Sequence, residues 1–347
     1  MTVRTETLSL LVGLAALAAA GCSAILGIGD VPNAAESDDG GSTEGGGEGG
    51  IDGSTLAPII LASGQSNPER IAVDGTSVFW ATSGNVVKCA TNGCGGVPTI
   101  LSFSQVAGSI KGIAVDDTFV FWTNNARSEV VGCAKASLND CTNTSKVFAS
   151  AELSPDAITV DGETIYWTSS DTAESPVRTC AIAGCAQPTP FASTAGSASR
   201  IVVDGTNVYW TDKAGSVRQC PKGGCGGNPI VLSSKSASIG GIGADLQSVY
   251  WSTDKEIIKC AIGGCGDTPS SVASGQRAFG GIAVSSAHVY WTNSDDGTVM
   301  KCAKAGCADR PTVIASGQKF PTGIATFGAS VYWTNRDGGT VVKLTLE

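Results

Sequence analysis

Gly281-Ile282-Ala283-Val284, followed five residues later by Val289-Tyr290-Trp291-Thr292, is one copy of a pattern that occurs seven times in this 347-residue chain. Both segments are short and rich in β-branched and aromatic residues, which is typical of buried strands. The seven Trp residues of the chain all occupy the same place in the pattern, each directly after a Phe or Tyr: Trp80, Trp122, Trp167, Trp210, Trp251, Trp291 and Trp333. An Ile stands nine residues before each Trp: Ile71, Ile113, Ile158, Ile201, Ile242, Ile282 and Ile324. This self-similarity indicates a repeat architecture.

Each repeat has room for four strands. In the sixth repeat, a third strand is expected over Thr298–Ala303 and a fourth over Pro311–Ala315, after a loop bounded by two Cys residues. Four short strands in about 42 residues are typical of a propeller blade. The sequence therefore predicts an all-β fold, a seven-bladed β-propeller of four-stranded blades.

The two ends of the repeat region predict how the ring closes. Residues 58–65 match residues 311–318, yet they precede the first Ile-to-Trp unit, and the last repeat stops at Glu347 after its third strand. We therefore expect the N-terminal strand to complete the last blade beside residues 341–346, which removes the open edges that would otherwise invite aggregation. The propeller is expected to span residues 56–347.

The second strand of the repeat resembles the YWTD motif of the low-density-lipoprotein-receptor class B propellers. It occurs here as Tyr209-Trp210-Thr211-Asp212, Tyr290-Trp291-Thr292-Asn293 and Tyr332-Trp333-Thr334-Asn335. The resemblance runs through residues 58–347 and implies the propeller fold. Propellers of that family usually have six blades, and in this chain Asp ends the tetrad only at Asp212.

The N-terminus has the features of an export signal. Arg4 precedes an apolar run over residues 8–20, too short for a permanent membrane span, and small residues lead to Cys22. This pattern resembles the lipobox of bacterial lipoproteins, which implies a signal peptide over residues 1–21, lipid on Cys22 and, because Ser23 follows, the outer membrane. An ordinary cleaved signal is the alternative. Residues 22–55 are rich in Gly, Ser and acids, so we expect a disordered tether.

Composition excludes several function classes. The net charge is −9, but residues 23–57 hold seven acids and no Lys or Arg, which leaves a net charge of only −2 over residues 58–347. Without a basic surface we expect no nucleic-acid partner. The single His, His288, is expected in a surface turn, and its isolation argues against most His-based catalysis and His-rich metal sites.

The 13 Cys residues indicate an oxidising compartment. Apart from Cys22, they form six pairs, one in each of the first six repeats: Cys89/Cys94, Cys133/Cys141, Cys180/Cys185, Cys220/Cys225, Cys260/Cys265 and Cys302/Cys307. We expect six disulfides that join facing positions of hairpins. Zinc is the alternative, but isolated pairs on separate blades cannot supply four ligands to one ion. In the seventh repeat, Leu344 and Ser54 stand where the two Cys would be.

Two positions beside the expected central channel depart from the repeat. Directly before the repeated Ile, five repeats carry Gly or Ala, whereas the first and fourth carry Arg70 and Arg200. Two guanidinium groups could bind a carboxylate or phosphate there, and solvated or ion-paired loop arginines are the alternative.

Acidic residues in the loops after the second strands offer oxygen ligands for calcium: Asp171, Glu174, Asp212, Asp254, Glu256, Asp295, Asp296 and Asp337. None forms a dense calcium-binding loop, so we interpret them as turn and solubility residues and predict no metal or cofactor. Five Asp residues, each six places before Trp, are interpreted as turn formers: Asp74, Asp116, Asp161, Asp204 and Asp245.

The sequence favours a monomeric, lipid-anchored propeller of the cell envelope that binds or scaffolds a protein or glycan, because no nucleophile, base and orienting residue form a recognisable set. Whether it faces the periplasm or the exterior is open. The alternative is an enzyme with its site at the channel, such as a calcium-dependent lactonase or other hydrolase, or a lyase. A part in outer-membrane assembly is a third hypothesis, based on analogy alone.

Overall fold

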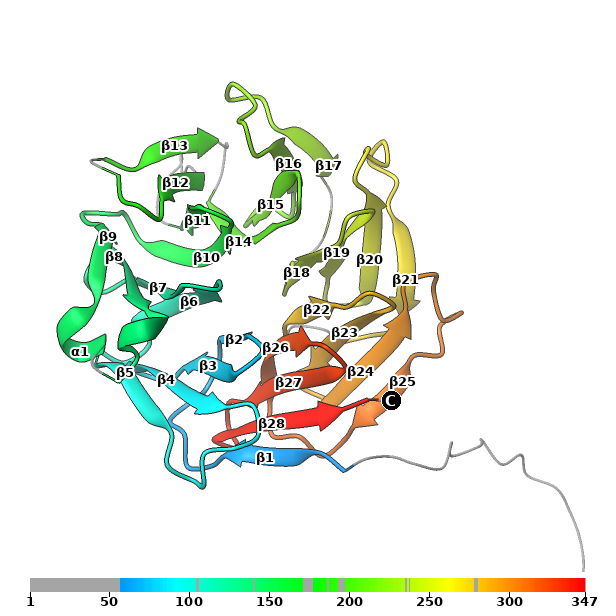
Figure 1. Ribbon diagram of the computed structural model, residues 1–347. Helices are drawn as coiled ribbons and strands as arrows, with labels where there is room; N and C mark the ends of the chain where they lie inside the picture. The colour runs from blue at the N-terminus through cyan, green and yellow to red at the C-terminus, as the bar shows by residue number, and fades with distance from the viewer. Residues whose placement is uncertain are drawn as a thin grey trace, which may run out of the picture. The chain divides into compact units, whose positions relative to one another are not determined.

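The computed structural model describes residues 57–346, with gaps at 104–105, 140, 171–176, 186, 193–196, 235, 237 and 278–279. These residues form seven antiparallel four-stranded sheets arranged as a ring of blades (Figure 1). The predicted seven-bladed propeller of four-stranded blades is confirmed. The predicted signal peptide, Cys22 and the tether lie outside the described residues.

The strands follow the repeats in order, and the first strand of blades 1 to 7 lies nearest the centre of the ring (Figure 1). Blade 1 contains β2 (Ile71–Val73), β3 (Ser77–Ala81), β4 (Asn85–Ala90) and β5 (Thr99–Phe103). Blade 2 contains β6 (Ile110–Val115), β7 (Phe119–Asn124), β8 (Glu129–Ala134) and β9 (Lys146–Ala149), with a short 3₁₀ helix η1 (Lys135–Ser137) and α1 (Cys141–Thr144) before β9. Blade 3 contains β10 (Pro155–Asp161), β11 (Thr164–Ser169), β12 (Val177–Ala181) and β13 (Thr189–Ala192). Blade 4 contains β14 (Ala198–Val203), β15 (Asn207–Asp212), β16 (Val217–Pro221) and β17 (Ile230–Ser233).

Blade 5 contains β18 (Ile242–Ala244), β19 (Ser248–Ser252), β20 (Glu256–Ala261) and β21 (Ser270–Ser274). Blade 6 contains β22 (Ile282–Val284), β23 (His288–Asn293), β24 (Thr298–Ala303) and β25 (Thr312–Ala315). Blade 7 contains β26 (Pro321–Phe327), β27 (Ser330–Asn335), β28 (Thr340–Thr345) and, as its outer strand, β1 (Ile59–Ala62). None of the described helices is long and apolar enough to cross a membrane.

The N-terminal strand closes the ring as predicted. β1 runs antiparallel to β28, with Ile59 opposite Lys343 and Ile60 opposite Val342 (Figure 1). Leu61 and Ala62 are buried in a cluster that also contains Tyr332 of blade 7 and Trp80 of blade 1. The first and last parts of the propeller therefore share one sheet and one core.

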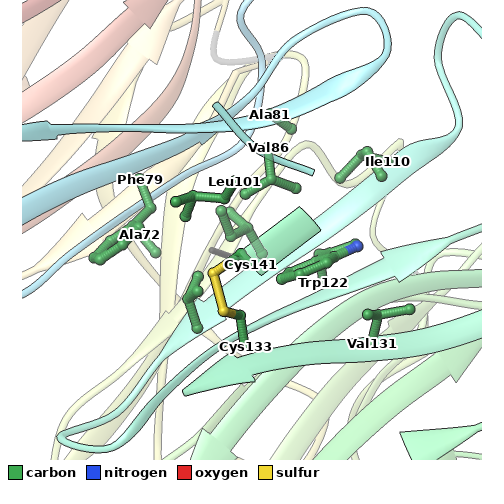
Figure 2. Close-up of a cluster of buried hydrophobic side chains, with 12 residues drawn as sticks. Ala72, Phe79, Ala81, Val86, Leu101, Ile110, Trp122, Val131, Cys133 and Cys141 are labelled. Carbon is green, nitrogen blue, oxygen red and sulfur yellow. A yellow bond between two sulfur atoms is a disulfide. The ribbon is translucent and has the colours of Figure 1, made fainter. Parts of the chain in front are cut away.

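The aromatic dipeptide explains why the sheets stack into a ring. Neighbouring residues of a strand point to opposite faces, so each Trp packs against the preceding blade and the Phe or Tyr before it packs against the following one. Figure 2 shows one such interface, in which Phe79 and Leu101 of blade 1 share a cluster with Trp122 of blade 2. The same pairing of aromatic residues recurs between Phe121 and Trp167, Tyr166 and Trp210, Tyr209 and Trp251, Tyr250 and Trp291, Tyr290 and Trp333, and Tyr332 and Trp80. The core consists of seven interfaces between blades.

Six disulfides join the predicted Cys pairs, with Cα–Cα distances of 5.3 to 5.6 Å. The bonds are Cys89–Cys94, Cys133–Cys141, Cys180–Cys185, Cys220–Cys225, Cys260–Cys265 and Cys302–Cys307. The predicted pairing is therefore confirmed for all twelve residues.

The expectation that each pair occupies facing positions of two strands is wrong. The first Cys of every pair lies in the third strand of its blade, but the second Cys does not belong to the fourth strand. The second Cys lies in the loop before that strand in five blades, at Cys94, Cys185, Cys225, Cys265 and Cys307, and in blade 2 it is Cys141, the first residue of α1.

The reason for this difference is the position of the turn. In blade 1, Lys88 of β4 already pairs with Thr99 of β5, so Cys94 lies within the connection between the two strands. The disulfide closes a turn in which the Gly93 N–H donates to the Ala90 carbonyl. The corresponding hydrogen bond joins Gly184 to Ala181, Gly224 to Pro221, Gly264 to Ala261 and Gly306 to Ala303.

The disulfides also lie at the interfaces between blades. The sulfur atoms of Cys89 and Cys94 approach the Leu61 carbonyl oxygen of the preceding blade at 3.8 and 3.5 Å. Cys185, Cys265 and Cys307 approach the corresponding carbonyl oxygens of Phe148, Leu232 and Val272. Cys225 packs against the apolar cluster between blades 3 and 4.

An apolar side chain replaces the first Cys in blade 7. Leu344 pairs with Val331 as Cys89 pairs with Val78, and it is buried against blade 6. The place of the first Cys is thus filled as the sequence alignment predicts. Ser54, at the expected place of the second Cys, lies outside the described residues.

Ion pairs divide six of the blades into three pairs. A Lys two residues after the first Cys of blades 2, 4 and 6 reaches the turn Asp of the preceding blade, which gives the pairs Lys135–Asp74, Lys222–Asp161 and Lys304–Asp245. Blades 3 and 5 carry Ile182 and Ile262 at this place, and both pack into the apolar interface. At the turns between the first and second strands, the contacts between blades 1 to 6 therefore alternate between ionic and apolar.

Deleting residues 56–66 is expected to lower the melting temperature sharply, because β28 would lose its neighbour and Leu61 would leave the core. The control replaces Ile59 and Ile60 by Ser, since 59% and 61% of their surfaces are exposed. Thermal unfolding followed by circular dichroism measures both variants. An unchanged melt of the deletion would contradict closure by β1.

Asp245→Asn is expected to lower the free energy of unfolding at pH 7 by on the order of 1 kcal/mol. Burial raises the pKa of Asp245, but hydrogen bonds from Lys304 and from the Gln247 and Ser248 N–H groups outweigh it, so the pKa lies below the ordinary 3.8. A lowered carboxyl pKa stabilises the fold above the ordinary value, and the contribution disappears as the pH falls through the folded value.

The difference in the free energy of unfolding between wild type and Asp245→Asn should therefore decrease below about pH 4. Urea unfolding at several pH values measures it. Asp117→Asn is the control, because Asp117 is exposed and forms no ion pair within the described part of the chain. A difference that stays constant down to pH 2 would show that the charge of Asp245 contributes nothing.

Candidate functional site

A cavity of about 180 Å³ lies where the inner strands converge. Its wall is the ring of repeated Ile side chains from all seven blades: Ile71, Ile113, Ile158, Ile201, Ile242, Ile282 and Ile324. The residues directly before these Ile form the rim. The sequence predicted a site over this channel, and Arg70 and Arg200 both line the cavity.

Most rim positions are glycine because the neighbouring blade leaves no room for a side chain. A Cβ on Gly323 would lie 2.1 Å from the Glu69 carbonyl oxygen, and one on Gly281 would lie 2.9 Å from that of Thr322. Gly112 and Gly241 are equally confined. The rim is therefore bare backbone over blades 5 to 7, and the two guanidinium groups extend from blades 1 and 4.

Each rim arginine donates one hydrogen bond to the next blade. Arg70 Nε donates to the Lys111 carbonyl at 2.8 Å, and Arg200 Nε donates to the Gly240 carbonyl at 2.9 Å. Within the described residues, the terminal nitrogens of both side chains have no hydrogen-bond acceptor, and neither arginine forms a salt bridge. Two forked donors therefore remain available at the cavity.

The charges of the two arginines act on each other. Repulsion from Arg70, together with burial, lowers the pKa of Arg200 to about 10, against a partial opposing effect of Asp156 and Glu69. Both side chains line the same cavity, although they belong to blades 1 and 4.

The hydrogen bonds of the rim arginines also have a structural role. The Thr after Trp usually links blades, because its hydroxyl donates to a rim carbonyl of the next blade. These bonds join Thr123 to Asp156, Thr168 to Ser199, Thr292 to Thr322 and Thr334 to Glu69. Blade 1 has the buried Ala81 at this place, and Arg70 Nε donates to the equivalent carbonyl of Lys111. Arg70 thus replaces the missing hydroxyl.

The described acidic residues do not gather into a cation site. Within residues 57–346, outside the gaps given above, no three His, Cys, Asp or Glu side chains are placed to hold a metal ion. Asp212 accepts hydrogen bonds from the backbone of its own turn and from Arg218. Asp171 and Glu174 lie outside the described residues.

The turn Asp residues and His288 lie at the other end of the inner strands. Asp74, Asp116, Asp204 and Asp245 accept hydrogen bonds from backbone N–H groups two and three residues later, as turn formers do. His288 is half-buried beside Tyr290, and burial together with Lys301 lowers its pKa. Because β22 separates it from the rim residue Gly281, His288 is not part of the channel site.

A buried ion pair was not predicted from the sequence. Glu152, which is 2% exposed, accepts a hydrogen bond from Trp167 Nε1 at 3.0 Å and lies 3.3 Å from Arg178 Nε. Gln65, Gln276 and Gln318 accept the corresponding Trp hydrogen bonds in blades 1, 6 and 7. The signal was present, since a residue 15 places before Trp carries a side-chain oxygen in each of these repeats.

Similar solved structures include a lyase and a chain of a nidogen–laminin complex. Virginiamycin B lyase from Staphylococcus aureus superposes with a TM-score of 0.66 at 12% identity, over 84% of this chain and 99% of that one. A catalytically inactive histidine-to-alanine variant of that lyase with quinupristin gives a TM-score of 0.64, also at 12% identity, over 84% of this chain and 99% of that one. A chain of a nidogen–laminin complex gives 0.52 at 18% identity, over 69% of this chain and 92% of that one.

The chain shares the propeller fold of these proteins. At such low identities the likeness extends to the fold alone. No protein-family model matches the sequence, and no curated protein matches it. The function therefore has to be inferred from the residues at the site.

Arg70→Ala is expected to lower the free energy of unfolding by about 1 kcal/mol, because blade 1 would lose its hydrogen bond to the Lys111 carbonyl. The second change Ala81→Thr should restore most of that loss, because it supplies the hydroxyl that blades 2, 3, 6 and 7 use. Urea unfolding of wild type, the single variants and the double variant measures the coupling. Equal stability of Arg70→Ala and the double variant would contradict the structural role of Arg70.

Proposed function

We propose that the protein is a non-catalytic binding module of the cell envelope whose ligand presents an anionic group to Arg70 and Arg200. The observation that carries this proposal is the pair of guanidinium groups at one cavity, neither of which forms a salt bridge among the described residues. Partly buried positive charge is costly when it is not compensated, and an anion from outside would supply the compensation.

The proposed ligand is a protein or glycan that bears the anion. A cavity of about 180 Å³ is below the roughly 300–1,000 Å³ of sites that enclose a drug-sized ligand. Only an end group would enter, and the rest of the ligand would rest on the face of the ring that carries the rim. A rigid ring of blades, six of which contain a disulfide, offers such a face without a large ordering cost.

The proposed location combines two kinds of support. Six disulfides indicate an oxidising compartment outside the cytoplasm. The lipobox-like sequence before Cys22 supports a lipid anchor in the outer membrane, with residues 22–55 as the tether. Attachment at the membrane would hold the propeller close to a partner in the envelope.

The test is crosslinking of the full-length protein in its native envelope, followed by affinity purification and identification of bound proteins and glycans. We compare wild type with Arg70→Gln/Arg200→Gln, in which the amides still supply a neutral donor for the rim carbonyls. Arg310→Gln is the control, because Arg310 is exposed outside the cavity lining.

The expected result is a stoichiometric partner with wild type and Arg310→Gln that is lost from the double variant. A partner retained by the double variant would contradict recognition through the rim arginines. Turnover of a substrate by the purified protein, with no stable partner, would favour an enzyme instead.

A further inference from the structure

We infer that the rim site takes a tetrahedral oxyanion, the terminal phosphate or sulfate group of a monoester, in preference to a carboxylate. This inference rests on the proposed function and specifies the chemical class of its ligand. It follows from the number of donors, the charge and the shape of the cavity.

The donors of the rim exceed what one carboxylate can accept. A guanidinium carries five N–H groups in a planar fork, and a single fork can already bind both oxygens of a carboxylate. At this rim only Nε of each arginine is used, by the carbonyls of Lys111 and Gly240. Four N–H groups therefore remain on each arginine, eight in all, against about four acceptor sites on one carboxylate. The three terminal oxygens of a phosphate or sulfate monoester offer more acceptor sites, in three directions.

The charge of the rim also favours the phosphate monoester among these groups. Arg70 and Arg200 repel each other, and the carboxylates of Glu69 and Asp156 offset the repulsion only in part. Neither carboxylate forms a salt bridge with an arginine in the described part of the chain. A phosphate monoester carries about −1.5 to −2 charges at pH 7 and bridges two cations better than a single carboxylate charge does.

The shape of the site fits a small head on a larger body. The Ile ring limits the cavity to about 180 Å³, which suits a small head group. Beside it, Gly240, Gly241, Gly281 and Gly323 line the opening without side chains. The body of the ligand can therefore leave the cavity over the backbone of blades 5 to 7.

The test compares the binding of three probes, each of which carries the same phenyl ring: phenyl phosphate, phenyl sulfate and benzoate. Isothermal titration calorimetry with the purified full-length protein at low ionic strength gives each affinity. We expect phenyl phosphate and phenyl sulfate to bind at least about tenfold more tightly than benzoate. Arg70→Gln/Arg200→Gln should lose this preference, and Arg310→Gln should keep it.

A pH series distinguishes the two sources of the oxyanion. The second pKa of a phosphate monoester is about 6, so the affinity for phenyl phosphate should fall between pH 7.5 and 5, whereas that for phenyl sulfate should stay constant. The tighter of the two at pH 7.5 identifies the monoester class of the natural ligand.

The outcomes separate this inference from the proposed function. Benzoate binding as tightly as the monoesters, with loss in the double variant, would overturn the oxyanion class and leave an anion-binding module. Binding of no probe, or binding that survives the double variant, would overturn both. If the double variant does not fold, Arg200→Gln alone is used, and a preference that it leaves unchanged also overturns the inference.

Discussion

The contact between neighbouring blades is the interaction on which the rest of the structure depends. No blade has a core of its own: each Trp is buried against the preceding blade and each preceding Phe or Tyr against the following one. The seven interfaces form a closed cycle only because β1 supplies the outer strand of blade 7. Without that strand, β28 would be an open edge of blade 7, and the cluster between blades 7 and 1 would lose Leu61.

The same contact determines what the rim of the channel can carry. Close approach of the inner strands leaves no room for a Cβ at Gly323 or Gly281. The arginine side chains of the other rim positions lie toward the cavity or along the rim. Arg70 and Arg200 do both, because each places one nitrogen on a neighbouring carbonyl and leaves its terminal nitrogens at the cavity. Structural and ligand-binding roles are thus combined in one side chain.

The disulfides and ion pairs reinforce this arrangement at the interfaces between blades. The first Cys of blade 1 lies against Leu61 of the preceding blade, and Leu344 fills the equivalent place in blade 7 with apolar volume. Lys135, Lys222 and Lys304 connect the blades two by two. A ring held at each interface by several kinds of contact is a rigid support for binding at its face, which lowers the entropic cost of recognition.

The sequence by itself determined the blade count, the strand pattern, the closure by the N-terminal strand and the Cys pairing, because each of these follows from residues that recur at a fixed spacing. It also singled out Arg70 and Arg200 as departures from the repeat. Only the tertiary structure decided that the second Cys of each pair lies outside the strands, that the two arginines line one cavity without a salt bridge among the described residues, and that Ala81 makes Arg70 a link between blades. It also showed that Glu152 is buried beside Arg178. The reason is physical: a repeat specifies which residues recur, whereas the exact turn within a blade and the distance between side chains of different blades are set by how the strands pair and how the ring closes.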